Sequence, residues 1–570
     1  MRRTTDARRG KSAESLPREL PTWLVAVVLA AAIWIVFGRS LAAPWIFDDR
    51  NSVLNNRSIQ SIWPLIGSAE RPGPLRPLVG TPISARPLVN LSLAANYQFS
   101  EHDPCGYRAV NVLLHLLNSL LLYAIVWRTL RLPRFVARYD DPVAKWLALV
   151  VALLWAVHPL VTETVVYVTQ RTELMVALFY LATLYASIRY WTVARVGSAR
   201  AWLVAAIATC LAGAASKEVM VSAPLVVLLF DWTFMSTSWR DVWRRHWPLY
   251  AGLATSWLVL AALQIGTPHG ESAGFSLGVS LVDWWSTQAE IFIMYLKLAI
   301  WPAPLAIHYE WPELETPRTA WMYIAATVAI VLATMWLIVR KRPAGPLLAA
   351  MLAILAPTHI IPVTTEIAAE RRMYLPLAAL VALCVCGVLW LERRRSSPTG
   401  GRAALSTMLA LALCLASAYG IVSARRVAAF LDPVDLWREN VILQTYNLVA
   451  RSNLASELIQ SGDRQEAIEH LRTALELNPD FNQGRYQLAL ALMAEGTLDA
   501  AAVELQELVR RKPEAYRVRN NLGVVLFSAG RFPEAIVEFE KVLELQPDFS
   551  EARENLNRAR RASVLPTDAE

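Results

Sequence analysis

Residues 23–37 read WLVAVVLAAAIWIVF, an uninterrupted apolar run without a charge. A membrane-spanning helix needs about 20 mostly apolar residues, and with its flanks this run extends over residues 22–42. Further segments have the same character, and they lie near residues 109–127, 145–161, 173–190, 201–216, 218–235, 247–265, 319–339, 344–363, 373–391 and 403–423. Residues 22–430 are therefore expected to form an all-α, polytopic membrane bundle of about eleven spans.

The charge of the chain changes sign where this bundle ends. Residues 431–570 contain 16 Lys and Arg against 23 Asp and Glu, whereas the first 430 residues contain the other 39 basic and 24 acidic residues. The net charges are thus −7 and +15. Short basic loops between apolar spans follow the positive-inside rule, so the basic excess does not require a nucleic-acid partner.

The basic segments also predict the orientation of the bundle. The N-terminal arm, residues 1–21, is basic and is expected in the cytoplasm, which places the loops 43–108 and 266–318 on the outer side. Residues 284–302, WWSTQAEIFIMYLKLAIWP, are predicted to be re-entrant or interfacial, because a twelfth crossing would put the basic loop 340–342 outside. The C-terminal region then lies on the outer side as well.

From residue 453 the sequence repeats with a period of 34. The recurring positions are Leu454, Leu488 and Leu522, Gly462, Gly496 and Gly530, Ala467, Ala501 and Ala535, and Pro479, Pro513 and Pro547. A helix–turn–helix unit of this length is typical of the tetratricopeptide repeat (TPR), an α-solenoid module. We expect a linker helix over 431–452, a TPR domain of about three repeats with a capping helix over 453–562, and a tail over 563–570. Such domains bind protein partners.

The first predicted outer loop opens with adjacent carboxylates in the sequence PWIFDDRN. Asp48 and Asp49 directly follow a span, at the expected membrane surface. A carboxylate there could act as a general base toward a hydroxyl group or could bind an ion. A helix-capping pair is an equally good interpretation of the sequence alone.

The second span carries a polar stripe in the sequence YRAVNVLLHLLNSLLLY. Asn111, His115 and Asn118 are spaced i, i+4 and i+7, so they share one face of the helix. Polar residues in spans usually face the interior of the bundle. Hydrogen bonding between helices and direct contact with a substrate are both open, and the first is the more ordinary.

Charged residues gather in two further predicted outer loops. His158, Glu163, Arg171 and Glu173 lie in HPLVTETVVYVTQRTEL, and a second cluster comprises Glu366, Glu370, Arg371, Arg372 and Tyr374 in IPVTTEIAAERRMYLP. Lys217 and Glu218 add another pair. Arginine binds phosphate through two parallel hydrogen bonds, so the clusters suit a lipid phosphate. Ion pairs between the loops are the alternative.

The cysteines and the two Asn-X-Ser triplets carry less information. Cys105, Cys210, Cys384, Cys386 and Cys414 lie mostly in apolar runs and have neither a zinc spacing nor a disulfide framework, so no bound metal is expected. The triplets at Asn56 and Asn90 matter only in a cell that glycosylates asparagine.

The order of these motifs resembles the transmembrane-and-TPR-containing O-mannosyltransferase family. The resemblance comprises FDD with a following Asn, the ARPL segment at 85–88, HP..TE…..R.E, SKE, AERRMYLP at 369–376 and the repeats. It implies a GT-C glycosyltransferase fold, a polyprenyl- or dolichyl-phosphate sugar as donor without a bound cofactor, and an active site on the outer face. The acidic pair of that family corresponds to Asp48 and Asp49, with Asp48 as the preferred base.

Taken together, the motifs and the resemblance predict an inverting membrane glycosyltransferase that transfers a sugar, expected to be mannose, to a hydroxyl group of a protein. The predicted donor-phosphate contacts are Arg371, Arg372, Arg171 and Lys217, and the predicted supporting residues are His115, His158, Glu163, Glu173, Glu370 and Tyr374. The expected location is a bacterial cytoplasmic membrane, or the endoplasmic reticulum in a eukaryote. The alternatives are a membrane-anchored TPR adaptor without enzymatic activity and, less favoured, a transporter.

Overall fold

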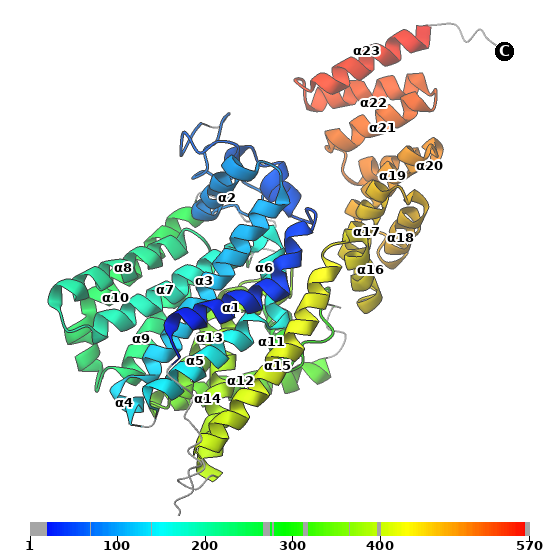
Figure 1. Cartoon of the computed structure of the whole chain (residues 1–570). Coiled ribbons are helices and arrows are strands. Elements are labelled where there is room, and N and C mark those ends of the chain that lie inside the picture. Colours follow the sequence, from blue (N-terminus) through cyan, green and yellow to red (C-terminus); the bar gives the residue numbers. More distant parts are fainter. Residues whose placement is uncertain are drawn as a thin grey trace, which may run out of the picture. The chain divides into compact units, whose positions relative to one another are not determined.

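The computed structural model describes residues 20–68, 70–137, 139–265, 274–275, 279–311, 317–363, 365–395 and 401–564 (Figure 1). Over these residues the chain is helical and has no strand beyond two isolated β-bridges. The predicted N-terminal arm therefore lies almost entirely outside the described residues, as do most of the tail and parts of the loop 266–318. The all-α fold class is confirmed.

The chain divides into two compact units. The membrane unit comprises residues Met1–Leu305, Leu314–Thr365 and Ala369–Leu431. The C-terminal unit comprises Asp432–Glu570 together with two short segments, Ala306–Glu313 and Glu366–Ala368. These short segments come from loops of the preceding sequence, so the boundary at 430 that the charge pattern predicts is not the whole boundary.

Eight helices of the described membrane unit are long and apolar enough to cross a bilayer. They occupy Thr22–Ala42, Pro104–Leu130, Val168–Thr192, Val196–Ala214, Trp239–Ile265, Ala320–Val339, Glu370–Leu391 and Leu405–Ala429, and they contain α1, α3, α7, α8, α10, α12, α14 and α15. A ninth candidate is bent by 58° between α5 (Asp141–Ala156) and Pro159–Val166, which includes α6 (Thr162–Val166). The bend lies at His158 and Pro159, where proline interrupts the helical hydrogen bonds.

Two predicted spans form shorter helices than the sequence pattern suggests. The segment 344–363 contains α13 (Ala344–Ile360), and the segment 218–235 contains a short 3-10 turn followed by α9 (Ala223–Phe234), which has 12 residues. Pro224 stands in the first turn of α9, where its missing N–H costs nothing, so the helix starts there and cannot extend backward. Hydrophobicity alone did not detect this start.

The segment 284–302 lies within one continuous helix, α11 (Leu281–Ile300). Its first turns are tied to the end of α13, because the indole N–H groups of Trp284 and Trp285 donate to the carbonyls of His359 and Ile360 at 3.0 and 3.2 Å. Asp283, Glu290 and Lys297 make α11 less apolar than the eight spans. The re-entrant assignment stays a prediction.

The first predicted outer loop packs around a small hydrophobic core, to which Val168 and Met175 near the start of α7 also contribute. Val53, Ile59 and Ile83 are buried together with Val89 of α2 (Pro87–Ser100) and with Tyr107 at the start of α3 (Pro104–Leu130). Apolar burial stabilises the packed loop by about 25 cal/mol per Å² removed from water. The carboxylate pair thus stands on a folded platform.

In the C-terminal unit, α16 (Pro433–Leu443) precedes a regular stack of helices that follow one another in order (Figure 1). They are α17 (Leu448–Ser461), α18 (Arg464–Leu477), α19 (Asn482–Glu495), α20 (Leu498–Arg511), α21 (Tyr516–Ser528), α22 (Phe532–Leu545) and the capping helix α23 (Ser550–Val564). The glycines at 462, 496 and 530 have φ values of +101°, +87° and +74°. Only glycine adopts this conformation without strain, so each one permits the turn between paired helices.

The predicted linker helix over 431–452 is interrupted. It ends at Leu443, and α17 starts at Leu448, because the side chain of Asn447 accepts a hydrogen bond from the N–H of Ala450 and caps the new helix. The first repeat therefore begins earlier than residue 453.

Candidate functional site

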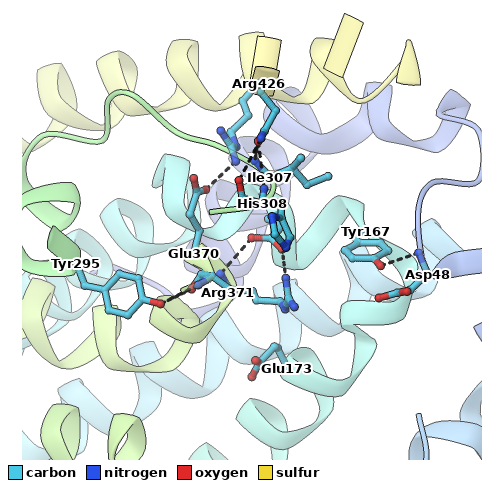
Figure 2. A network of polar contacts seen from close by, with 12 residues as sticks. Asp48, Tyr167, Glu173, Tyr295, Ile307, His308, Glu370, Arg371 and Arg426 are labelled. Carbon is cyan, nitrogen blue, oxygen red and sulfur yellow. Dashed lines mark hydrogen bonds and ion pairs between the residues drawn. The ribbon is translucent and has the colours of Figure 1, made fainter. Parts of the chain in front are cut away.

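The two adjacent carboxylates occupy different environments. Asp49 is fully buried, and its Oδ1 accepts hydrogen bonds from the N–H and the hydroxyl of Thr169, both at 2.8 Å. Asp48 is only partly buried, and its backbone N–H donates to the hydroxyl of Tyr167 at 2.9 Å (Figure 2). Asp49 thus fastens the loop to the segment before α7 (Arg171–Thr192), whereas Asp48 is the more accessible carboxylate.

Burial raises the pKa of Asp49 to about 6, although nearby Arg108 and the hydrogen bonds from Thr169 and Ile46 act in the opposite direction. Desolvation penalises the ionised form of a carboxyl group, and a nearby cation favours it. At neutral pH Asp49 is largely ionised in spite of its burial. This leaves a buried negative charge next to Asp48 in the chain, and Arg108, Arg171 and the hydrogen bonds from Thr169 and Ile46 stabilise it.

Arg108 is a residue of this site that the sequence analysis missed. It is fully buried near the start of α3, and its guanidinium donates to the carbonyls of Ala43, Pro44 and, at 3.1 Å, Val166. It thereby joins the end of the first span to the end of α6. The signal was present in the sequence, because an arginine inside an apolar span is costly and needs partners.

Arg171 also has a structural role. Its guanidinium is buried and donates to Asn111 Oδ1 at 2.9 Å, to Asn96 Oδ1 at 2.9 Å and to the carbonyl of Tyr107 at 2.8 Å, with a longer contact to Ser92. These bonds join α2 and α3 to the first turn of α7. The predicted contact with a donor phosphate is not what this geometry favours, because protein oxygens already surround the group.

The second arginine cluster is organised by buried glutamates. Arg371 Nη1 lies 2.6 Å from Glu163 Oε1, and the backbone N–H of Arg371 donates to the other oxygen at 3.2 Å. Glu370 pairs with Arg426 of α15 (Gly401–Ala429) at 2.8 Å (Figure 2). Both glutamates are inaccessible to solvent, whereas Arg371 and Arg372 are partly exposed. Arg426 was not identified from the sequence.

Tyr167 links the carboxylate pair to this arginine cluster. It lies within electrostatic range of Asp48, Asp49 and Arg371, and its N–H donates to the carbonyl of Glu163 at 3.0 Å. The structure therefore brings together two of the predicted groups, the acidic pair and the loop at 370–373. Tyr167 itself was not among the predicted residues.

Lys217 is held by a buried pair. Its ammonium group donates to Glu173, and both side chains are at most a tenth exposed. The neighbouring Glu218 instead contacts Arg86 at 3.3 Å. Burial raises the pKa of Glu218, but Arg86 and Lys217 outweigh it and lower that pKa to about 2. Lys217 therefore forms its ion pair with Glu173 and not with Glu218, its neighbour along the chain.

The polar stripe of α3 forms hydrogen bonds between helices. His115 contacts the hydroxyl of Tyr374 at 2.7 Å and the carbonyl of Ala156 at 2.9 Å, and Asn118 donates to the same hydroxyl at 3.2 Å. Trp155 donates to the carbonyl of Tyr374 at 2.8 Å. Because Tyr374 follows Arg372 by two residues, these contacts fix the end of the arginine loop.

His158 has a similar supporting position. Its Nε2 lies 3.1 Å from the carbonyl of Ala299, its Nδ1 accepts from the N–H of Leu160 at 3.2 Å, and its ring stacks edge-on against Tyr419. In the described part of the chain, no three His, Cys, Asp or Glu side chains are grouped so that they could hold a metal ion.

The fold and these residues define a class: a polytopic membrane protein with an acidic pair and an arginine loop near one another, followed by TPRs. The tetratricopeptide repeat family model matches residues 458–522 and 492–558. Protein O-mannosyl-transferase TMTC4 of Homo sapiens is 34% identical over 167 residues, which cover 28% of this chain and 22% of that protein. Protein O-mannosyl-transferase Tmtc2 of Drosophila melanogaster is 30% identical over 35% of this chain and 20% of its own length.

A longer match extends through most of the chain. Protein O-mannosyl-transferase TMTC1 of Homo sapiens is 25% identical over 509 residues, which cover 80% of this chain and 55% of that protein. The matches thus span about a fifth to about half of the length of these relatives. Among solved structures, a TPR protein with an unusual peptide-binding site, YrrB, covers 31% of this chain at 23% identity with a TM-score of 0.22. The comparisons confirm the resemblance that the motifs predicted.

Proposed function

We propose that this protein is a membrane glycosyltransferase that transfers a sugar from a polyprenyl-phosphate carrier to a hydroxyl group of a protein. The observation that carries the proposal is the difference between the two adjacent carboxylates: Asp49 is fully buried and accepts hydrogen bonds from Thr169, whereas Asp48 is partly exposed. The similarity to proteins named O-mannosyl-transferases supports mannose as the sugar and protein as the acceptor.

In the proposed reaction Asp48 accepts the proton of the acceptor hydroxyl while that oxygen attacks the anomeric carbon of the sugar. The bond between this carbon and the carrier phosphate breaks, and the phosphate leaves with the electron pair. A single displacement inverts the configuration. Arg371 and Arg372 stabilise the negative charge that develops on the phosphate, as preorganised cations do in electrostatic catalysis. Glu163 holds Arg371 in place.

Lys217 and Arg171 take different parts in this scheme. Arg171 is a positioning residue, because its guanidinium is enclosed by Asn111, Asn96 and Tyr107. Lys217 is a candidate second phosphate contact only if its pair with Glu173 opens. The TPR domain is proposed to recruit the polypeptide acceptor on the outer side of the membrane.

The deciding experiment is sugar transfer from a purified polyprenyl-phosphate sugar to an acceptor protein, followed by glycan mass spectrometry. The unsubstituted protein is expected to transfer the sugar, and Asp48→Asn is expected to insert and fold but not to transfer it. Full activity of Asp48→Asn, Asp49→Asn and the double variant would remove the proposed base. Absence of transfer by the unsubstituted protein would instead favour the TPR adaptor.

The proposed orientation has its own test. Ser461, in the first repeat, and Ser198, in α8 (Val196–Ala214), are predicted on opposite sides of the membrane. In permeabilised cells with intact inner membranes, a cysteine at position 461 is expected to react with an impermeant thiol reagent and one at position 198 is not. The reverse pattern would place the repeats in the cytoplasm.

A further inference from the structure

Within the C-terminal unit, an extended segment is gripped by side-chain amides. The backbone N–H groups of Ile307 and His308 donate to Asn440 Oδ1 at 2.9 and 3.1 Å. The Nδ2 of Asn440 donates back to the carbonyl of His308 at 3.1 Å. One asparagine thus satisfies both the donors and the acceptor of a short stretch of main chain.

A second set of contacts continues this grip toward α17. Asn447 Nδ2 donates to the carbonyl of His308 at 3.0 Å, and the N–H of Glu310 donates to Gln444 Oε1 at 2.9 Å. The carboxylate of Glu310 accepts from the N–H of Leu448 at 2.5 Å, at the first residue of α17. We refer to Asn440, Gln444 and Asn447 as the asparagine clamp.

The two asparagines of the clamp are buried. Asn440 is 2% and Asn447 1% exposed, and His308 is 6% exposed. Hydrogen bonds shielded from water are electrostatically stronger, and a buried amide that loses its partners pays its full desolvation cost. The segment from 306 to 310 is therefore a fixed part of this unit rather than a loop that lies loosely against it.

Residues 306–310, which the clamp holds, also contact the chain that precedes Arg371 and Arg372. Tyr309 forms an antiparallel β-bridge with Ala368, also within the C-terminal unit. The next residue, Ala369, belongs to the membrane unit, where the hydroxyl of Tyr295 contacts both its N–H and its carbonyl at 2.9 Å. Glu370 and Arg371 follow at once. Consecutive residues before the arginines are thus anchored one to each unit.

We propose that the asparagine clamp is a positioning device for the donor-binding arginines. The clamp holds residues 306–310, these hold Ala368 through Tyr309, and Ala368 sets the start of the chain that carries Arg371 and Arg372. Fixing a loop in advance removes an ordering cost from the reaction step. The inference rests on the proposed function and adds Asn440, Gln444 and Asn447 to it, as residues that act through the loop and do not touch substrate.

The test uses the full-length protein with the double substitution Asn440→Ala and Asn447→Ala. The matched control is Asn453→Ala, because Asn453 lies on α17 but donates only to the carbonyl of Val449 one turn earlier. The first readout is the rate of labelling of a cysteine introduced at His308, in each background. The second is the kinetics of sugar transfer with varied polyprenyl-phosphate sugar.

The clamp variant is expected to label about tenfold faster at position 308 and to show a KM for the lipid donor raised by about tenfold, the size that a lost buried hydrogen bond gives. Its KM for the acceptor protein is expected to stay as in the control. Asn440→Asp, which retains Oδ1 for Ile307 and His308, is expected to fall between the two.

Faster labelling with unchanged donor kinetics would overturn the inference, because the clamp would then be a tether without influence on the arginines. Unchanged labelling would overturn it as well. Absence of transfer by the unsubstituted protein would overturn the proposed function, and the labelling result would show separately whether the clamp holds the segment.

Discussion

Arginines form recurring contacts in the repeats and contacts that differ from one another in the membrane unit. In the repeats, Arg485 donates to Glu504, 19 residues later, at 2.6 Å and to the carbonyl of Pro479, six residues earlier, at 2.8 Å. Arg519 repeats this arrangement with Glu538 at 2.6 Å and with the carbonyl of Pro513 at 3.0 Å. In the membrane unit no such rule holds, since Arg108, Arg171 and Arg371 each have a different set of partners.

The partners that join the candidate site are distant in the sequence. Arg371 meets Glu163 across 208 residues, and Asp49 meets Thr169 across 120. In the repeats a pair that is lost has equivalents one period away, whereas the pairs Arg371–Glu163 and Asp49–Thr169 each occur once and are largely buried. Arginine thus stabilises the repeats through equivalent contacts that recur every 34 residues, and the membrane unit through a few contacts that differ from one another.

The largest effect is expected at Asp48, the proposed catalytic base. Asp48→Asn is expected to lower the rate of sugar transfer by about 10² to 10⁴, the usual contribution of a positioned base. Transfer assays with purified protein measure this. Asp103→Asn is the matched control, because Asp103 caps α3 in the same loop by accepting from the N–H of Cys105, and an amide oxygen can do the same. An equal loss in both variants would contradict the role of Asp48.

The next effect compares a buried pair with a repeated one. Glu163→Gln leaves Arg371 without its anionic partner in a buried setting and is expected to reduce the free energy of unfolding by about 3–5 kcal/mol. Glu504→Gln, with side chains of 13% and 21% exposure in the pair, is expected to cost about 1 kcal/mol or less. Chemical denaturation in detergent measures both, and similar values would break the comparison.

A smaller effect concerns pH. Because the pKa of Asp49 is raised from 3.8 to about 6 by burial, the fold favours its protonated form. Its contribution to stability is therefore greatest below pH 4 and is lost as the pH rises toward and through 6. Relative to Asp49→Asn, which does not titrate, the unsubstituted protein is expected to gain about 1 kcal/mol between pH 7 and pH 5. A loss of stability between pH 7 and pH 5 would instead show that Arg108 outweighs burial and lowers the pKa of Asp49.

The smallest effects test the equivalence of the repeats. Alanine at Gly462, Gly496 or Gly530 must adopt a positive φ, at an expected cost of about 1 kcal/mol each. Gly197, near the start of α8, has open space around it and an ordinary φ, so alanine there is expected to be neutral or stabilising. Thermal unfolding measures the series. Strongly unequal costs at the three turns would show that the repeats are not energetically alike.

These regions also differ in how far sequence alone predicts them. The repeats were predictable because a period of 34 places each contact at a constant separation, and the glycine turns follow from it. Most spans were predictable from apolar length, but α9 was not, because Pro224 and not hydrophobicity sets its start. The continuous helix α11 was expected to be re-entrant or interfacial, and this assignment stays a prediction.

The candidate site was predictable only in part, because Arg108, Tyr167 and Arg426 were not expected and the roles of the expected residues were not evident. Asp48 and Asp49 are indistinguishable in sequence, and only Thr169, far along the chain, separates them. Arg171 was expected to bind phosphate because the local sequence does not reveal its partners. These partners, Asn111 and Asn96, lie on two other helices. The asparagine clamp gave no signal at all, since Asn440 and Asn447 contact main-chain atoms that any residue could supply.

The buried asparagines of the first loop have a consequence for producing this protein. Asn56 and Asn90 are the acceptor positions of the two glycosylation triplets, yet both are inaccessible, and Asn56 Nδ2 donates to Asn90 Oδ1 at 3.0 Å. A glycan would occupy the nitrogen that these contacts need, so a host that modifies the chain before this loop folds would yield a misfolded platform. Ser92→Ala removes one triplet with little structural cost, because its hydroxyl bonds only within its own helix turn. Ser58→Ala would remove the other triplet at a greater structural cost, because the Ser58 hydroxyl donates to Asn56 and accepts from Asn90.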